Sequence, residues 1–163
     1  TLMSNMGLEA RLREADIVFH RTPVGDRYVH EKLKQEGLKL GGEQSGHILF
    51  LDLAPTGDGM LTALQTLGAM KSSGKDLSDW YQALPMYPQM LKNVRVRDKE
   101  SLVRSPLLQK AVSEAEAALS GRGRVNVRPS GTESLVRVML EGPAEIIEPL
   151  SHQLVRLVES LGK

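Results

Sequence analysis

Apolar residues in the first half of the chain switch repeatedly between helical and extended spacing. Helices are expected after Ser4 or Asn5, after Asp26, and after residues 56–59, the last two ending at Gly37 and at residues 72–74. Short strands are expected at residues 17–19, 38–40 and 48–51. Such alternation favours a layered α/β unit with at least some parallel strands.

A stretch with two prolines, residues 84–88, predicts a domain boundary, so we expect domains over residues 1–85 and 86–163. Beyond it the pattern changes to strand, helix, strand, strand, helix. Pro106 is placed to start the first of these helices, and Pro149 either starts or kinks the last. This half predicts a small α+β domain with two helices on one face of an antiparallel sheet.

The loop at residues 128–133, Arg-Pro-Ser-Gly-Thr-Glu, has the chemistry of a phosphate site. Because side chains alternate along a strand, Arg128 and Arg137 should both project from the side of the sheet that the helices do not cover. The connecting loop adds the hydroxyls of Ser130 and Thr132 and backbone amides exposed by Gly131. Forked guanidinium groups with several short neutral donors suit a phosphate dianion.

Two other interpretations of this region remain open at this point. One is a polar hairpin with two solvated arginines. The other is a nucleic-acid surface, because Arg95, Arg97 and Arg124 would add to the same face. The chain has only six aromatic residues, and the expected strands of this half hold none on which bases could stack. That deficit argues against nucleic acid as a partner.

A second polar loop, residues 42–47, has the chemistry of a polyol-binding site. Glycines on both sides permit a tight turn and close approach of a ligand. Glu43 can accept two hydrogen bonds from a vicinal diol, and Ser45 can donate or accept one. His47 can donate to a phosphate or move a proton near neutral pH. The alternative is an ordinary β-turn with a solvated glutamate. Together the two loops indicate a ligand with a sugar end and a phosphate end.

Composition narrows the class of protein without naming a function. A net charge of +1 over 163 residues gives no general attraction to nucleic acid or to an anionic membrane. No apolar run approaches the roughly 18 residues of a membrane span, and no signal-peptide pattern opens the chain. The absence of cysteine excludes disulfides and thiolate metal sites. We expect a cytoplasmic protein without a membrane partner. The opening at Thr1 predicts a piece of something longer.

Several motifs in order resemble the carboxy-terminal part of the bacterial phosphoglucosamine mutases, a family within the α-D-phosphohexomutase superfamily. The similarity covers nearly the whole chain, and its motifs lie at residues 3–8, 24–29, 42–47, 56–59, 93–96, 128–133 and 136–139. The resemblance implies a four-domain enzyme, of which this chain would hold most of the third domain and all of the fourth.

The resemblance also implies roles for individual residues. The first loop would hold the sugar hydroxyls in both substrate orientations, and the second would bind the phosphate that is not transferred. Ser134 replaces the proline usual in the family, which could loosen the turn without removing a phosphate donor. The implied residues are Glu43 and Ser45 for the sugar, His47 beside the reacting end, Arg21 and Arg27 in a loop near the ligand, and Arg128, Ser130, Gly131, Thr132 and Arg137 for the phosphate.

The implied reaction converts glucosamine 6-phosphate to glucosamine 1-phosphate through a bisphosphate intermediate, and it feeds amino-sugar and cell-wall precursor synthesis. Such mutases use a phosphoserine nucleophile and a magnesium ion held by a run of aspartates, both in earlier domains. This chain has no acidic cluster of that kind, so we expect no metal site in it. Its partners would be the substrate and the earlier domains. We therefore expect the chain alone to bind weakly and to catalyse nothing. A phosphosugar-binding module without chemistry is the alternative.

Overall fold

The computed structural model describes residues 1–162, which form two compact units. The first runs from Thr1 to Met86 and the second begins at Tyr87. Each unit has its own cluster of buried apolar side chains. The predicted fold class, an α/β unit followed by a small α+β unit, is confirmed. No helix within residues 1–162 combines the length and apolar character needed to cross a membrane.

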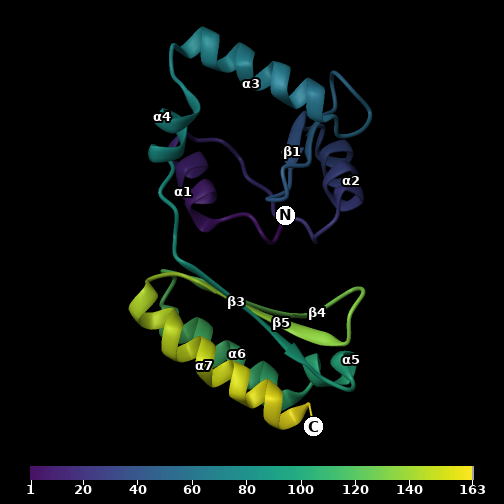
Figure 1. Ribbon diagram of the computed structural model, residues 1–163, viewed down its shortest axis with the longest axis vertical. Helices are drawn as coiled ribbons and strands as arrows, with labels where there is room; N and C mark the ends of the chain where they lie inside the picture. Colours follow the sequence, from purple (N-terminus) through teal and green to yellow (C-terminus); the bar gives the residue numbers. More distant parts are fainter. Residues whose placement is uncertain (163) are drawn as a thin grey trace. The chain divides into compact units, whose positions relative to one another are not determined.

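The first unit surrounds a short antiparallel hairpin with helices (Figure 1). Strand β1 pairs with β2 so that Leu40 lies opposite Phe50 and Gly42 opposite Ile48. Helix α2 packs on this hairpin through Val29 and Leu33, which are buried together with Leu49. The elements are α1 (Met6–Glu14), α2 (Asp26–Glu36), β1 (Leu40–Gly42), β2 (Ile48–Phe50), α3 (Gly59–Ser73) and α4 (Leu77–Gln82).

Local capping explains where these helices begin and end. The Asn5 side chain accepts a hydrogen bond from the Gly7 amide at 2.9 Å, and the Asp58 side chain accepts one from the Leu61 amide at 2.9 Å. Gly37 ends α2 in a left-handed conformation, which glycine adopts without steric cost. The expected cap at Asp26 is wrong by one position, because Gly25 is the N-cap and Asp26 is the first helical residue.

Two expectations for this unit are wrong. Residues 17–19 form no strand, because no strand of the described residues pairs with them, and Ile17 and Val18 are 53% and 73% exposed. No parallel pair occurs within residues 1–162 either, since the hairpin and the second sheet are both antiparallel. Helix α4 was not expected, although Asp76 and Asp79 form a reciprocal capping box at its start.

The second unit is a three-stranded antiparallel sheet in the order β3-β5-β4, with α6 and α7 side by side on one face (Figure 1). This arrangement confirms the predicted α+β pattern. Ser105 is the N-cap residue of α6, although its side chain makes no capping hydrogen bond, and Pro106 starts the helix, as expected. Pro149 lies inside α7 and does not start it. The elements are β3 (Gln89–Arg95), α5 (Lys99–Val103), α6 (Pro106–Leu119), β4 (Arg124–Pro129), β5 (Leu135–Glu141) and α7 (Ala144–Leu161).

Alternation along the strands sets the two faces of this sheet. Val125, Val136, Val138 and Leu140 are buried in the core cluster that includes side chains of α6 and α7. Their strand neighbours therefore project from the other face. On β4 these neighbours are Arg124, Asn126 and Arg128, and on β5 they include Arg137.

Candidate functional site

The β4–β5 hairpin places two arginines opposite each other. Arg128 and Arg137 are direct partners in the strand register, so both lie on the face opposite the helices. Side chains of directly opposed residues begin only about 5 Å apart. The pair borders the loop of residues 130–134, which the Ser130 amide closes by donating to the Leu135 carbonyl at 2.9 Å.

The two guanidinium groups raise each other's energy in the absence of an anion. Burial lowers the pKa of Arg128 from its ordinary value, and the positive charge of Arg137 lowers that pKa further. The carboxylate of Glu133 lies 3.6 Å from the Nη2 atom of Arg137. A dianion between the arginines would offset their repulsion, which is the electrostatic requirement of a phosphate site.

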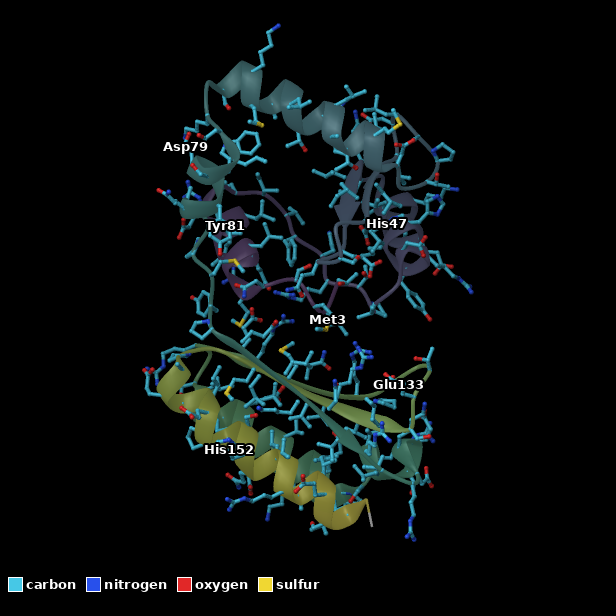
Figure 2. The ribbon with its side chains drawn as sticks, in the orientation of Figure 1. Met3, His47, Asp79, Tyr81, Glu133 and His152 are labelled. Atoms are coloured by element: carbon cyan, nitrogen blue, oxygen red, sulfur yellow. The ribbon has the colours of Figure 1, made fainter. Side chains whose placement is uncertain are left out.

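Two donors of this site, one in the arginine pair and one in the loop, lack hydrogen-bond partners among residues 1–162. The Nε atom of Arg137 and the hydroxyl of Ser130 are both buried and make no hydrogen bond. A buried polar group without a partner costs about 1–3 kcal/mol. A ligand oxygen reaching either group would recover that free energy. Thr132 is exposed in the same loop and precedes Glu133, which Figure 2 labels.

Lys99, at the start of α5, was missed by the sequence analysis. Its Nζ atom donates to the Ser130 carbonyl at 2.5 Å and to the Glu133 carbonyl at 3.0 Å. The lysine therefore ties both ends of the loop to α5. Since Lys99 and Ser130 are 31 residues apart, no local sequence pattern indicates this contact.

Gly131 offers a way to separate ligand contact from folding. A Cβ atom built on it would meet nothing within 4 Å, and its φ lies outside the left-handed region. We expect Gly131→Ala to fold normally but to raise KM for a phosphosugar about tenfold, because the methyl group would enter the space proposed for the phosphate. Steady-state kinetics with a thermal melt measures both. An unchanged KM would show that the ligand does not approach Gly131.

The second predicted loop is the turn between β1 and β2. The Glu43 amide donates to the His47 carbonyl at 3.0 Å, and the Gly46 amide donates to the Glu43 carbonyl at 3.0 Å. Gly46 has φ +89°, a conformation that requires glycine. The turn is therefore well defined, and it leaves the Ser45 side chain exposed.

The Glu43 carboxylate is fixed by a residue that the sequence analysis did not select. The Gly25 amide donates to Glu43 Oε1 at 3.0 Å, just before α2 begins. Gly25 has φ +128°, so a side chain there would be strained. With one oxygen anchored in this way, the other Glu43 oxygen is left to accept from a ligand hydroxyl.

His47 lies at the end of this turn, against the loop that precedes α3 (Figure 2). A Cβ atom on Gly57 would come within 2.4 Å of the imidazole, so only glycine leaves room for the ring at this distance. The carboxylate of Asp26 lies 3.7 Å from His47 Nε2. This nitrogen makes no hydrogen bond within residues 1–162.

Gly57→Ala should displace the His47 ring with little effect on folding. Because the clash is with the end of a side chain, we expect the thermal midpoint to change little. We expect kcat to fall about tenfold or more if His47 moves a proton in the reaction. Gly59→Ala is the matched control, since a Cβ atom on Gly59 meets nothing within 4 Å. Equal kcat in the two variants would remove His47 from the reaction.

The two arginines expected in a loop near the ligand have other surroundings. Arg27 lies in the first turn of α2 and not in a loop, and its Nε atom donates to Glu31 at 2.8 Å. That contact raises the pKa of Arg27. Arg21 is outside the helices and donates to Glu9 at 2.9 Å and to the Ser4 carbonyl at 2.8 Å. Arg21 therefore holds the turn at residues 1–4 in place.

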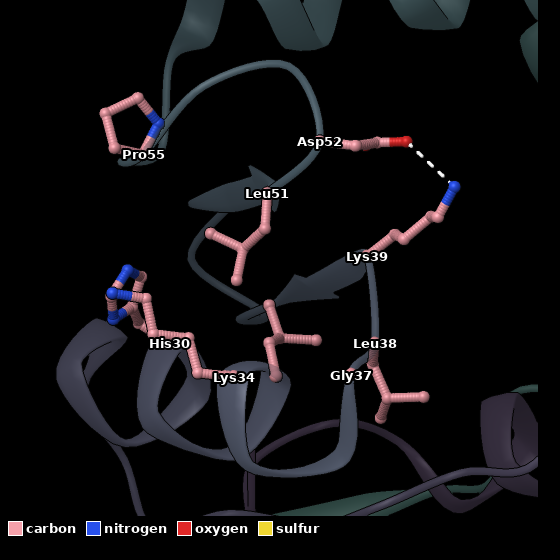
Figure 3. Close-up of a pocket in the computed structure, with 9 residues that line it drawn as sticks. His30, Lys34, Gly37, Leu38, Lys39, Leu51, Asp52 and Pro55 are labelled. Carbon is pink, nitrogen blue, oxygen red and sulfur yellow. Dashed lines mark ion pairs between the residues drawn. The ribbon is translucent and has the colours of Figure 1, made fainter.

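A shallow hollow of about 390 Å³ lies at the other end of the β1–β2 hairpin (Figure 3). His30 and Lys34 of α2 line it, together with Lys39, whose Nζ atom is 3.4 Å from the Asp52 carboxylate. Residues 38–39 precede β1 and residues 51–52 follow β2, so the hollow is separated from the turn at residues 43–47 by the length of the hairpin.

Comparison with known protein families decides the class of protein. Domain III of phosphoglucomutase/phosphomannomutase, an alpha/beta/alpha domain, matches residues 1–87, and the C-terminal domain of the same family matches residues 91–157. The chain belongs to the phosphoglucomutase/phosphomannomutase family. This confirms the resemblance predicted from the sequence motifs.

Curated proteins similar to this chain include phosphoglucosamine mutases. The chain is 59% identical to one from Thermus thermophilus over 163 residues and 55% identical to that of Deinococcus radiodurans over 163 residues. These alignments cover 100% and 99% of this chain. The chain spans 37% of the length of both relatives.

Solved structures of the phosphohexomutases share the fold. N-acetylphosphoglucosamine mutase of Aspergillus fumigatus matches with a TM-score of 0.86 at 19% identity, covering 98% of this chain and 37% of that one. An N-acetylglucosamine-phosphate mutase in its substrate complex matches with a TM-score of 0.78 at 22% identity, covering 95% and 37%. The Aspergillus enzyme has also been solved with GlcNAc-6P and magnesium.

Magnesium, which phosphohexomutase membership implies, does not fit the side chains of this chain. Within residues 1–162 no three His, Cys, Asp or Glu residues are grouped so that they could hold a metal ion. Two of the acidic residues near the loops, Asp26 and Glu133, are paired with His47 and Arg137. The residues that the structure describes therefore supply no ligand set for magnesium.

Proposed function

We propose that this chain provides the sugar-binding and phosphate-binding loops of a phosphoglucosamine mutase that interconverts glucosamine 6-phosphate and glucosamine 1-phosphate through a bisphosphate intermediate. Residues 1–85 would form the sugar-binding domain and residues 86–163 the phosphate-binding domain. The observation that carries the proposal is the opposed pair Arg128 and Arg137 beside an open Ser-Gly-Thr loop. The similarity to phosphoglucosamine mutases supports the choice of substrate.

The phosphate loop would bind the phosphate group that is not being transferred. Arg128 and Arg137 would each present a fork of N–H donors to its oxygens. The amides of Gly131 and Thr132 would add neutral donors, because neither amide has an acceptor within residues 1–162. The hydroxyls of Ser130 and Thr132 would complete the set.

The turn at residues 43–47 would hold the sugar. The Glu43 carboxylate, with one oxygen anchored by the Gly25 amide, would accept hydrogen bonds from neighbouring ring hydroxyls, and Ser45 would contribute one more. His47 would donate to, or exchange a proton with, the reacting end of the ligand. Arg27 would reach the ligand only by leaving Glu31.

In this proposal the chain contributes positioning: a phosphoserine of the earlier domains would be the phosphoryl donor, and a magnesium ion held in those domains would neutralise charge at the transferring group. When the chain holds the remote phosphate and the sugar hydroxyls, binding free energy offsets part of the entropic cost of orienting the substrate. Such positioning is worth several kcal/mol in oriented reactions. The two substrates place different ends at the reacting centre. A phosphate loop that recognises only the phosphate, and a carboxylate that accepts from either of two hydroxyls, serve both orientations.

The proposal is tested by incubating the complete gene product with glucosamine 6-phosphate and following glucosamine 1-phosphate by ³¹P NMR. We expect turnover, and a higher kcat/KM for glucosamine 6-phosphate than for mannose 6-phosphate or glucose 6-phosphate. Binding without turnover would support the phosphosugar-binding module instead. Sub-micromolar binding of a single-stranded oligonucleotide with a steep salt dependence would support a nucleic-acid function.

A further inference from the structure

A single lysine donates hydrogen bonds to two carbonyl groups of the phosphate loop. Lys99 Nζ donates to the carbonyls of Ser130 and Glu133, at 2.5 Å and 3.0 Å. These two carbonyls lie near the two ends of the segment 130–134, which joins β4 to β5. Lys99 is therefore a clamp across the loop, in addition to the Ser130–Leu135 hydrogen bond at its base.

The direction of a carbonyl fixes the direction of the next amide. In a trans peptide unit the C=O and the following N–H point in opposite directions, and no peptide bond within residues 1–162 is cis. With the Ser130 carbonyl aimed at Lys99, the Gly131 amide points away from the lysine. The same holds for the Ser134 amide after the Glu133 carbonyl. Neither amide has an acceptor within residues 1–162.

The loop alone would not hold this arrangement. Gly131 has no Cβ atom and no side-chain contact that would restrict its peptide units, and residues 131–134 are exposed. Peptide units in such a loop can rotate by coupled changes in ψ and φ. A charged donor that binds two carbonyls at once opposes that rotation, because hydrogen bonds to charged groups are stronger than those between neutral groups.

We propose that Lys99 is a positioning residue of the phosphate loop: it holds the Ser130 and Glu133 carbonyls on one side so that the Gly131 amide is presented to the anion on the other. The inference rests on the proposed function, since it takes this loop to be the phosphate site. Lys99 itself is assigned no contact with the phosphate. Its role is distinct from that of the arginines, which would touch the ligand.

The experiment is a comparison of Lys99→Met and Lys99→Arg in the complete gene product, with glucosamine 6-phosphate as the probe. Methionine keeps most of the side-chain volume and removes the donor, so we expect KM to rise about tenfold while kcat changes about twofold or less. Hydrogen exchange of a peptide spanning residues 128–137 should become faster. Without the Lys99 contacts the loop is less ordered, so the hydrogen bond from the Ser130 amide to the Leu135 carbonyl opens more often. Arginine can donate to both carbonyls, and we expect it to restore most of the affinity.

The control variant is Lys110→Met, which removes the same charge from α6, where the lysine faces Glu114 at 3.8 Å. We expect KM to stay at the wild-type value. An equal rise in KM for Lys99→Met and Lys110→Met would overturn the inference, because net charge would then explain both. Lys99→Gln replaces Lys99→Met if the latter melts below the assay temperature.

Arg137→Ala separates this inference from the proposed function. If Lys99→Met keeps wild-type KM and exchange while Arg137→Ala raises KM, Lys99 has no positioning role and the phosphate site stands. If neither variant changes KM, the loop is not the phosphate site, and both the inference and the proposed function fail.

Discussion

Replacing Arg128 or Arg137 by alanine in the complete gene product should lower kcat/KM for glucosamine 6-phosphate by about 100-fold to 1,000-fold. Each guanidinium group would make charge-assisted hydrogen bonds to the phosphate, worth about 1.5–3 kcal/mol each. The two residues lie directly opposite each other in the strand register, so the loss of one leaves a single guanidinium group to bind the phosphate. Steady-state kinetics over a range of substrate concentrations measures the effect.

The thermal midpoint of these variants should not fall together with their activity. Like charges in directly opposed positions of a sheet are destabilising, and Arg137 lowers the pKa of Arg128. Removing either arginine should therefore leave the thermal midpoint of the ligand-free protein unchanged or slightly raised. If a variant lost activity because it unfolds, its thermal midpoint would fall.

Two further variants sharpen this prediction. Arg156→Ala removes an exposed arginine from α7, on the helical side of the sheet, and should leave kcat/KM unchanged. Arg137→Lys keeps the charge but not the planar fork, and should recover only part of the loss. Wild-type kinetics in both Arg128→Ala and Arg137→Ala would refute the phosphate assignment.

Replacing Glu43 by alanine should have the second-largest effect, a fall in kcat/KM of about 100-fold. The variant removes the acceptor proposed for two sugar hydroxyls, and hydrogen bonds to a charged acceptor are worth about 1.5–3 kcal/mol each. It also removes the contact that joins the turn to Gly25. Glu43→Gln keeps a carbonyl oxygen for the Gly25 amide while losing the charge, so its kcat/KM should lie between those of wild type and alanine.

Gln44→Ala is the matched control, because Gln44 is the next residue of the same turn and its side chain is exposed. We expect kinetics close to wild type. If Glu43→Ala and Gln44→Ala have the same kcat/KM, then the turn affects the reaction only through its general shape, or does not affect it. Either result would remove Glu43 from the proposed sugar contacts.

Strand alternation was sufficient to predict that the two arginines share a face. Val125 and Val138 are buried against the helices, and the residues between the buried positions must then project the other way. Because β4 and β5 are consecutive and joined by a short loop, the register could vary little. The relation between Arg128 and Arg137 is therefore a local property of the hairpin, and local properties are visible in a sequence.

The contacts that orient the loops are not local and could not be predicted. Lys99 reaches Ser130 across 31 residues, Gly25 reaches Glu43 across 18, and the His47 ring rests on Gly57 only because two loops meet. These contacts depend on how α5, α2 and α3 pack in their own units. Nothing in the residue types near Lys99 distinguishes it from a solvated lysine.

The expected strand at residues 17–19 shows that residue types alone do not predict strand pairing. Its apolar residues have a high strand propensity, but a strand exists only when another strand pairs with it. Ile17 and Val18 remain exposed and outside any sheet within the described residues. The expected parallel pairing is wrong for the same reason, because composition and alternation do not determine which strands become neighbours.

A crystal structure of the complete gene product bound to glucosamine 6-phosphate would show whether Arg128 and Arg137 hold the phosphate. We expect phosphate oxygens about 2.7–2.9 Å from guanidinium nitrogens of both Arg128 and Arg137, with the Gly131 amide donating to the same phosphate. A ligand bound with its phosphate elsewhere, and with the loop at residues 130–134 in contact with no part of it, would show that this loop is not the phosphate site.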